Sequence, residues 1–187
     1  GDAAAMGAVN TVVVRQGRAV GYNTDGEGFV RSLPFTVSRK RVLVLGSGGA
    51  ASAVSRALRR SGAAVTICCR RPEKTVGWDM ETRLWRELPL LAADCDLLVN
   101  ATPLGMDGKP PFPELSFLRA APREAVVYDL VYQPRRTALL ASASACGLAT
   151  VPGTSLLLHQ AVRAFTLFTG APVNVPALSR AVERQLG

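Results

Sequence analysis

An α/β fold, in which a doubly wound parallel sheet carries helices on both faces, is predicted by three observations on this 187-residue sequence. Short apolar runs alternate with segments of helical character, which is the order of elements that builds a parallel sheet covered on both sides. The hydrophobic content of 48% against 19% charged residues is typical of a globular chain with one good core. The first strand of the main series ends in a glycine turn that opens directly into a helix.

The expected elements follow one another in a regular order. The strands of the main sheet are expected at 42–45, 63–69, 96–101, 125–130 and 148–151, and its helices at 50–60, 137–145, 153–168 and 177–186. Gly62 and Gly147 are placed to end two of these helices, and Pro176 to open the last one. Residues 76–93 show no clean strand period, which suggests an irregular or short helical cover.

The first 33 residues do not fit this alternating unit. Residues 9–14 and 19–22 are expected to be two strands around a turn at Gln16-Gly17, and a helix is expected at 27–33. They look like the tail of a preceding domain and the helix that links it to the next. Because a hairpin without a sheet to join leaves an exposed edge, we expect an N-terminal segment to be absent from this chain.

Bulk properties argue against several classes of function. No apolar run reaches the ~18–20 residues that span a bilayer, and the start lacks the basic and apolar regions of a secretory signal. The net charge of +8 comes from scattered arginines rather than a dense basic stripe, so nucleic acid is not an expected partner. No metal site is expected, and the cysteines form no Cys-x-x-Cys pair, which favours a reducing, cytoplasmic location. The four cysteines of the chain are Cys68, Cys69, Cys95 and Cys146.

Residues 41–53 are typical of a dinucleotide site in a Rossmann-like fold. The turn consists of Gly46, Ser47, Gly48, Gly49 and Ala50. Gly46 permits a sharp exit from the strand, Gly48 leaves room for phosphate oxygens, and the free N–H groups of the first helical turn face the anion. A lone glycine motif is weak evidence, so the alternative is an ordinary strand–turn–helix without a ligand.

The end of the next strand indicates which dinucleotide is bound. An NAD site usually has Asp or Glu about 20 residues after the glycines, where it accepts a hydrogen bond from the ribose 2′-hydroxyl. This chain has Arg70 and Arg71 there, with Lys74 close behind. Because arginine can bind a phosphate through two parallel hydrogen bonds, NADP is expected rather than NAD. The alternative is a solvated basic loop.

Six ordered segments together resemble the shikimate dehydrogenase family. They are GAVNT (7–11), GYNTDGEGF (21–29), VLGSGGAASAV (44–54), NATPLGM (100–106), YDLVYQP (128–134) and PGTSLLLHQAVRAFTLFTG (152–170). The resemblance implies NADPH-dependent, reversible reduction of 3-dehydroshikimate to shikimate in aromatic amino-acid biosynthesis. It also implies three parts: a remnant of an α/β substrate domain at 1–25, an NADP-binding domain at 26–154, and C-terminal helices at 155–187 that return toward the substrate domain.

The resemblance implies a role for residues in each motif. The expected substrate ligands are Asn10, Asp25, Tyr132 and Gln160, and Asp25 is also the expected catalytic member of a Lys–Asp pair that exchanges a proton with the substrate. The further cofactor contacts expected are Asn100, Thr102, Leu104, Leu130 and Gly153. Simpler structural roles are the alternatives: Asp25 as a helix N-cap, Asn10 as a turn residue, and Gln160 as a solvated helix position.

The family's catalytic Lys and its Ser and Thr substrate ligands lie upstream of the first of these motifs. The lysines of this chain, Lys40, Lys74 and Lys109, are not placed in sequence to replace it. We therefore expect a chain that binds NADP(H) but by itself turns over little or no shikimate. The alternatives are an NAD-dependent quinate/shikimate dehydrogenase and a non-catalytic dinucleotide-binding module. Pairing with the missing segment is expected, and a homodimer is left open.

Overall fold

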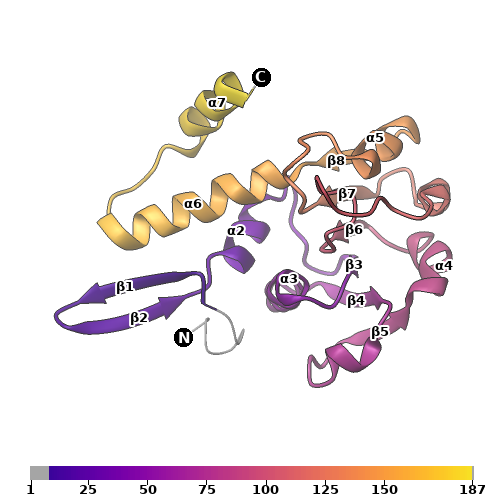
Figure 1. Ribbon diagram of the computed structural model, residues 1–187, viewed down its shortest axis with the longest axis horizontal. Helices are drawn as coiled ribbons and strands as arrows, with labels where there is room; N and C mark the ends of the chain where they lie inside the picture. The colour runs from indigo at the N-terminus through magenta and orange to yellow at the C-terminus, as the bar shows by residue number, and fades with distance from the viewer. Residues whose placement is uncertain (1–8, 187) are drawn as a thin grey trace.

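A six-stranded parallel sheet forms the main body of the computed structural model, which describes residues 9–186 (Figure 1). Its strands are β3 (Arg41–Leu45), β4 (Ala64–Cys69), β5 (Glu81–Leu84), β6 (Leu97–Asn100), β7 (Val126–Asp129) and β8 (Ala149–Val151). The spatial order is β5-β4-β3-β6-β7-β8, and every neighbouring pair is parallel. The strand order therefore reverses between β3 and β6, as the predicted doubly wound fold requires.

Helices cover both faces of this sheet. On one face lie α2 (Asp25–Ser32) and α3 (Gly49–Arg60); on the other lie α4 (Leu88–Ala92), the 3-10 helix η3 (Ser116–Ala120) and α5 (Ala138–Ala145). Alternate residues of β3 show the division, since Val42 and Val44 join the first core while Leu43 and Leu45 join the second. Each buried aliphatic side chain of this kind contributes about 1.5–3 kcal/mol. The prediction of helices on both faces is confirmed.

The ends of the helices follow the local sequence. At the start of α5, Thr137 is the N-cap residue, and its hydroxyl accepts a hydrogen bond from the Leu140 N–H at 3.3 Å. Gly147 has a φ of +78° just beyond the same helix, where a left-handed residue ends a helix without strain. The long helix α6 (Gly153–Thr169) ends at Gly170 in the same conformation, and α7 (Val175–Leu186) opens with Pro176 at its second position.

β5 lies in the stretch where no strand was expected, so that expectation is wrong for residues 81–84. The strand is short and stands at the edge of the sheet that the described residues form, next to β4. An edge strand with solvent on one side does not need a continuous apolar run, and charged residues such as Glu81 and Arg83 are common there. The rest of the stretch matches the expected short helical cover: the 3-10 helix η2 (Trp85–Glu87), followed by α4.

The chain begins with a separate two-stranded antiparallel sheet, β1 (Thr11–Arg15) and β2 (Arg18–Tyr22). Gln16 and Gly17 both have positive φ, 49° and 74°, which is the geometry of a two-residue hairpin turn. Figure 1 shows this hairpin beside α6, and the Arg15 guanidinium donates a 3.0 Å hydrogen bond to the Leu167 carbonyl there. The helix that follows, α2, packs against both α3 and α6, and so joins the hairpin to the main sheet.

Candidate functional site

A cavity of about 490 Å³ opens at the carboxyl ends of four adjacent strands. Its wall includes the turn after β3, the residues that follow β4, the first residue after β5, and the segment after β6. The cavity lies where the strand order reverses, which is the place where open α/β sheets bind their ligands. Of the expected cofactor contacts, the residues that line it are Gly46, Ser47, Gly48, Arg70, Arg71, Lys74, Thr102 and Leu104.

The glycine turn has the predicted geometry. Gly46 has a φ of +118°, and a Cβ there would stand 2.9 Å from the Ala101 carbonyl oxygen, so only glycine fits. At Gly48 and Gly49 an added Cβ would meet nothing within 4 Å, so this backbone is open to a ligand. Among residues 9–186, no side chain caps the start of α3. The N–H groups of its first turn, from Gly49 and the exposed Ala50 onward, are therefore directed to an anion.

Three cations stand beside this turn. Arg70, Arg71 and Lys74 line the cavity and are exposed, and within residues 9–186 their side chains make no hydrogen bond or ion pair. Charges without a protein partner at the mouth of a cavity attract an anionic ligand, because nothing in the fold neutralises them. Together with the open first turn of α3, they make this cavity suited to a ligand that carries several phosphates.

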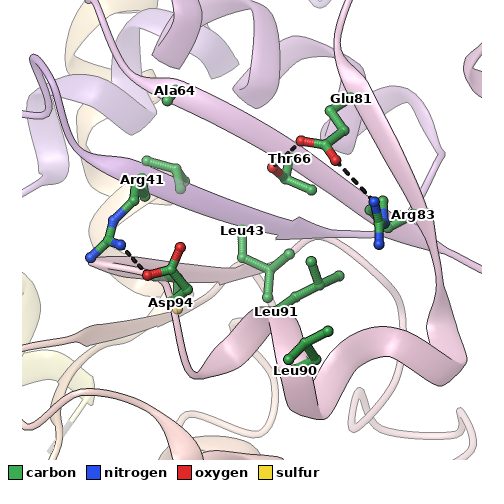
Figure 2. A pocket seen from close by; sticks show the side chains of 11 residues that line it. Arg41, Leu43, Ala64, Thr66, Glu81, Arg83, Leu90, Leu91 and Asp94 are labelled. Carbon is green, nitrogen blue, oxygen red and sulfur yellow. Dashed lines mark hydrogen bonds and ion pairs between the residues drawn. The ribbon is translucent and has the colours of Figure 1, made fainter.

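A second cavity, of about 480 Å³, lies on the face of β3, β4 and β5 toward their amino ends, and Figure 2 shows its lining. Its arginines already have partners within the protein. Arg41 pairs with Asp94, and Arg83 pairs with Glu81 at 3.3 Å and with Glu87. This cavity therefore presents neutralised charges, and it is the weaker candidate for an anionic ligand.

Asn100, at the end of β6, holds the loop that forms one wall of the first cavity. Its side chain is fully buried, and its Nδ2 donates to Asp129 Oδ1 at 2.8 Å and to the Leu104 carbonyl at 3.3 Å. Its Oδ1 accepts from the Thr102 N–H at 3.0 Å and from the Thr102 hydroxyl at 2.6 Å. All its hydrogen-bonding capacity is used inside the protein. The amide therefore positions Thr102 and Leu104. These two residues line the cavity, whereas Asn100 does not line it.

Asp129, at the end of β7, anchors the same network and was not expected from the sequence. Its carboxylate also accepts from the Thr137 hydroxyl at 2.6 Å and from the Val131 N–H at 3.0 Å. Burial raises the pKa of this carboxyl, and the three hydrogen bonds it accepts act in the opposite direction. A lone Asp after an apolar strand was the available signal, within the motif YDLVYQP.

Asn10 and Asp25 form a second polar cluster, at the junction of the hairpin and α2. Asn10 Nδ2 donates to Asp25 Oδ1 at 2.8 Å, while Asn10 Oδ1 accepts from the Thr24 N–H at 2.9 Å. Asp25 is half-buried, and burial raises its pKa while the hydrogen bond from Asn10 partly lowers it. The first two residues of the motif GAVNT, Gly7 and Ala8, lie outside the described residues.

The structure assigns the capping of α2 to a different residue from Asp25. Asn23 Oδ1 accepts from the N–H groups of Asp25 and Gly26, at 3.1 and 3.4 Å. The N-cap position itself is Thr24, and Asp25 is the first residue of the helix. The alternative interpretation of Asp25 as an N-cap is therefore wrong, and its carboxylate accepts a hydrogen bond from Asn10 instead.

Gln160 lies on α6, which packs against α2 almost backbone to backbone. A Cβ added to Gly28 would stand 2.8 Å from the backbone nitrogen of Gln160, so glycine is needed at this crossing. An ion pair of 2.7 Å between Arg163 and Glu27 holds the same two helices together. Because Gly28 is about one helical turn beyond Asp25, the close crossing brings the backbone of Gln160 to the next turn of α2 from Asp25.

The structure places the remaining expected residues elsewhere. Leu130 and Gly153 do not line the 490 Å³ cavity. They contact each other, since a Cβ on Gly153 would stand 2.5 Å from the Leu130 carbonyl oxygen, and so they seat the start of α6 on the end of β7. Tyr132 is 50% exposed on the segment after β7.

Other kinds of site find no support in the part of the chain that the structure describes. Within residues 9–186, no group of three or more His, Cys, Asp or Glu side chains is arranged to hold a metal ion. Over the same residues, no helix combines the length and the apolar character needed to cross a bilayer. Cys68, Cys69 and Cys95 are buried free thiols, and Cys146 is an exposed one.

Comparisons with known proteins give a consistent result, although no protein-family model matches the chain. The chain is 45% identical over 188 residues to the shikimate dehydrogenase (NADP(+)) of Acidiphilium cryptum strain JF-5, a match that covers 96% of this chain and 67% of that protein. Its curated relatives are thus matched over about two thirds of their length.

Solved structures agree with the sequence match. Shikimate 5-dehydrogenase from Thermus thermophilus, in complex with NADP(H) and shikimate, matches with a TM-score of 0.82 and 34% identity over 98% of this chain and 70% of that one. Quinate dehydrogenase from Corynebacterium glutamicum, in complex with NAD, matches with a TM-score of 0.84 and 32% identity, over 97% and 70% of the two chains.

Proposed function

This chain belongs to the shikimate dehydrogenase family, and from that premise we propose that it binds NADP(H) and forms one side of a site that interconverts 3-dehydroshikimate and shikimate. The observation that carries the proposal is the group of three cations without protein partners, Arg70, Arg71 and Lys74, beside the open glycine turn. A dinucleotide with an additional 2′-phosphate matches both features, while NAD would leave the cations without a ligand group.

The residues present fit the cofactor from its phosphates outward. Gly48, Gly49 and the first turn of α3 would hold the pyrophosphate, because no side chain of the described residues caps the start of this helix and a Cβ at either glycine would meet no atom within 4 Å. Arg70, Arg71 and Lys74 would hold the 2′-phosphate. Bound NADPH supplies the hydride for the reduction.

On the substrate side, Asn10, Asp25 and Gln160 would bind the hydroxyl groups of the ring, with Tyr132 at the edge of the site. Reduction of a ketone also requires a proton at the carbonyl oxygen, and a carboxyl whose pKa is raised by burial is suited to exchange one. The amide of Asn10 fixes Asp25 from one side at 2.8 Å. Asp25 would thus orient the substrate and take part in the movement of the proton.

A lysine partner for Asp25 is not supplied by the lysines of this chain. Lys40 pairs with Asp96, Nζ to Oδ1 at 3.9 Å, at the amino edge of the sheet, and Lys74 lines the cofactor cavity. Lys109 is exposed on the loop between β6 and η3. We propose that this chain binds the cofactor but needs a cation from another segment for efficient turnover.

The experiment measures cofactor binding and turnover on the same sample. NADPH fluorescence should change on addition of the chain, which reports binding. Oxidation of shikimate with NADP⁺, followed by NADPH absorbance, should be no faster than for Asp25→Asn. Failure to bind NADPH would refute the cofactor assignment. Robust shikimate oxidation by the chain alone, lost in Asp25→Asn, would refute the need for an added cation.

Two alternatives have distinct signatures. An NAD-dependent quinate/shikimate dehydrogenase would bind NAD⁺ at least as tightly as NADP⁺, which the three unpartnered cations disfavour. A non-catalytic dinucleotide-binding module would bind NADPH with no response to shikimate. The division of the chain at 1–25, 26–154 and 155–187, pairing with a separate N-terminal segment, a homodimer and a cytoplasmic location stay predictions.

A further inference from the structure

Trp85 stands at the carboxyl end of β5, the strand that the sequence did not predict. β5 pairs in parallel with β4, and the register places Leu84 beside Cys69, so the residues that follow, Trp85 and Arg70, leave the sheet side by side. The indole lines the 490 Å³ cavity together with the three cations. The edge strand thus brings a large, half-buried aromatic side chain into the cavity wall, next to its basic part.

Packing behind the indole holds it in place. Trp85 stacks on Phe112, with ring centroids 6.3 Å apart and an interplanar angle of 27°, and Phe112 in turn packs on Phe117. Phe112 is buried in the core that contains α4 and α5. An aromatic side chain with two χ angles and a fixed neighbour is a preorganised surface, which loses little entropy when a ligand packs on it.

The adjoining wall is apolar and rigid. Pro110, Pro111 and Pro113 line the cavity, and proline offers no N–H donor. The Gly105 N–H donates to the Pro110 carbonyl at 2.9 Å, which fixes the start of this segment. One end of the cavity is therefore aromatic and apolar, in contrast to the glycine turn and the cations.

This division of the cavity matches the parts of an adenine dinucleotide. The pyrophosphate and the 2′-phosphate need donors and cations, whereas the adenine base is flat, has two apolar faces and stacks well on indole. We propose that Trp85, backed by Phe112, is the stacking surface for the adenine base, and that the proline segment 110–113 forms the adjoining wall. The inference rests on the proposed function and assigns to Trp85 the affinity for the base.

The test uses adenosine 2′-monophosphate, which carries the base and the 2′-phosphate, and inorganic pyrophosphate, which carries neither. In calorimetric titrations, Trp85→Ala should weaken binding of the nucleotide by about tenfold to a hundredfold, the range that loss of one stacked base produces. Trp85→Phe, which keeps an aromatic face, should retain most of the affinity. Pyrophosphate binding should be the same in all variants.

Fluorescence supplies a readout that a purely structural role would not produce. The chain has two tryptophans, so each can be observed alone. In Trp78→Phe the remaining indole is Trp85, and adenosine 2′-monophosphate should quench its emission because the base stacks on it. In Trp85→Phe the remaining indole is Trp78, which packs against the opposite core, and its emission should not respond.

The outcomes separate this inference from the proposed function. If the wild-type chain binds NADP⁺ but quenching is equal in the two single-tryptophan variants, the role of Trp85 is refuted and the proposed function stands. A folded Trp85→Ala variant that binds adenosine 2′-monophosphate with wild-type affinity would also refute the role of Trp85. If the wild-type chain binds neither NADP⁺ nor adenosine 2′-monophosphate, both proposals fall. Should Trp85→Ala fail to fold by circular dichroism, the two fluorescence variants still decide.

Discussion

Asp25 illustrates how much a single residue depends on neighbours that the local sequence does not identify. The motif NTDG offers Asn23, Thr24 and Asp25 as capping residues for the same helix. In the fold, Asn23 accepts the hydrogen bonds from the helix N–H groups, and Asn10, from the start of the hairpin, binds Asp25 instead. Asp25 is therefore a half-buried carboxyl with one fixed partner.

A pH-dependent stability difference should follow from that environment. Burial raises the pKa of Asp25, so the folded state binds its proton more tightly than the unfolded state does. The carboxyl therefore favours folding most below its unfolded pKa, and this contribution is lost as pH rises through the raised folded pKa. Relative to Asp25→Asn, the wild type should lose stability as pH rises from about 3 toward 7, by less than about 1 kcal/mol because solvent screens the half-exposed group.

Urea unfolding of both proteins across that pH range is the measurement. Asp107→Asn, which removes an exposed carboxyl from the loop after β6, is the control and should give no comparable trend. A stability difference between wild type and Asp25→Asn that stays constant, or that grows in favour of the wild type with pH, would show that burial does not govern this carboxyl.

Asn100 shows why a motif match alone did not define the contacts of a residue. The resemblance in the motif NATPLGM implied that Asn100 is a cofactor ligand, and the loop that Asn100 holds does line the cavity. Its amide is nevertheless buried and fully used by Thr102, Leu104 and Asp129. Asp129 comes from a strand 29 residues later, and its position opposite Asn100 follows only from the parallel register of β6 and β7. We infer that Asn100 acts on the cofactor through the loop.

At the scale of elements, the crossing of α2 and α6 depends on a single missing side chain. Gly28→Ala should destabilise the protein by about 1–3 kcal/mol, because its Cβ would overlap the backbone at Gln160 and force the helices apart. Gly49→Ala, also at a helical glycine, meets no atom within 4 Å and should raise stability by about 0.4–1 kcal/mol.

Urea unfolding measures the stability of the two variants, and an NADPH titration measures their affinity for the cofactor. Gly49→Ala should weaken NADPH binding despite its greater stability, because the added methyl group enters the space left for the phosphates. Gly28→Ala should leave the cofactor cavity intact. Equal effects of the two substitutions on stability would contradict the close crossing, and unchanged NADPH binding by Gly49→Ala would contradict the phosphate position.

The elements themselves were predictable where burial leaves a pattern in the sequence. β3, β4, β6 and β7 are apolar because helices cover both of their faces, and these four strands and β8 were each predicted to within about one residue of their ends. β5 could not be found this way, because all four of its residues are exposed or half-buried and two of them, Glu81 and Arg83, are charged. The Trp85 surface was missed with it, since only the pairing of β5 with β4 brings Trp85 to the cavity.

Over the whole molecule, the doubly wound sheet and the hairpin carry different parts of the chemistry. The sheet places the glycine turn, the three cations and Trp85 around one cavity at its carboxyl edge. The hairpin and α2 place Asn10 and Asp25 next to the helix that carries Gln160. The long helix α6 begins at the sheet and runs over the hairpin, which ties the two polar clusters to one frame (Figure 1).

The central claim is that the unpartnered cations select a cofactor with a 2′-phosphate, and a calorimetric titration of this chain with NADP⁺ and with NAD⁺ tests it most directly. NADP⁺ should bind at least about tenfold more tightly, the value of one charge-assisted contact, and the preference should shrink as salt is added. Arg70→Ala and Arg71→Ala should each lower the affinity for NADP⁺ and leave that for NAD⁺ nearly unchanged. Arg86→Ala, which removes a nearby exposed cation outside the cavity wall, is the matched control. Equal affinities for the two cofactors, unaffected by either arginine substitution, would contradict the account.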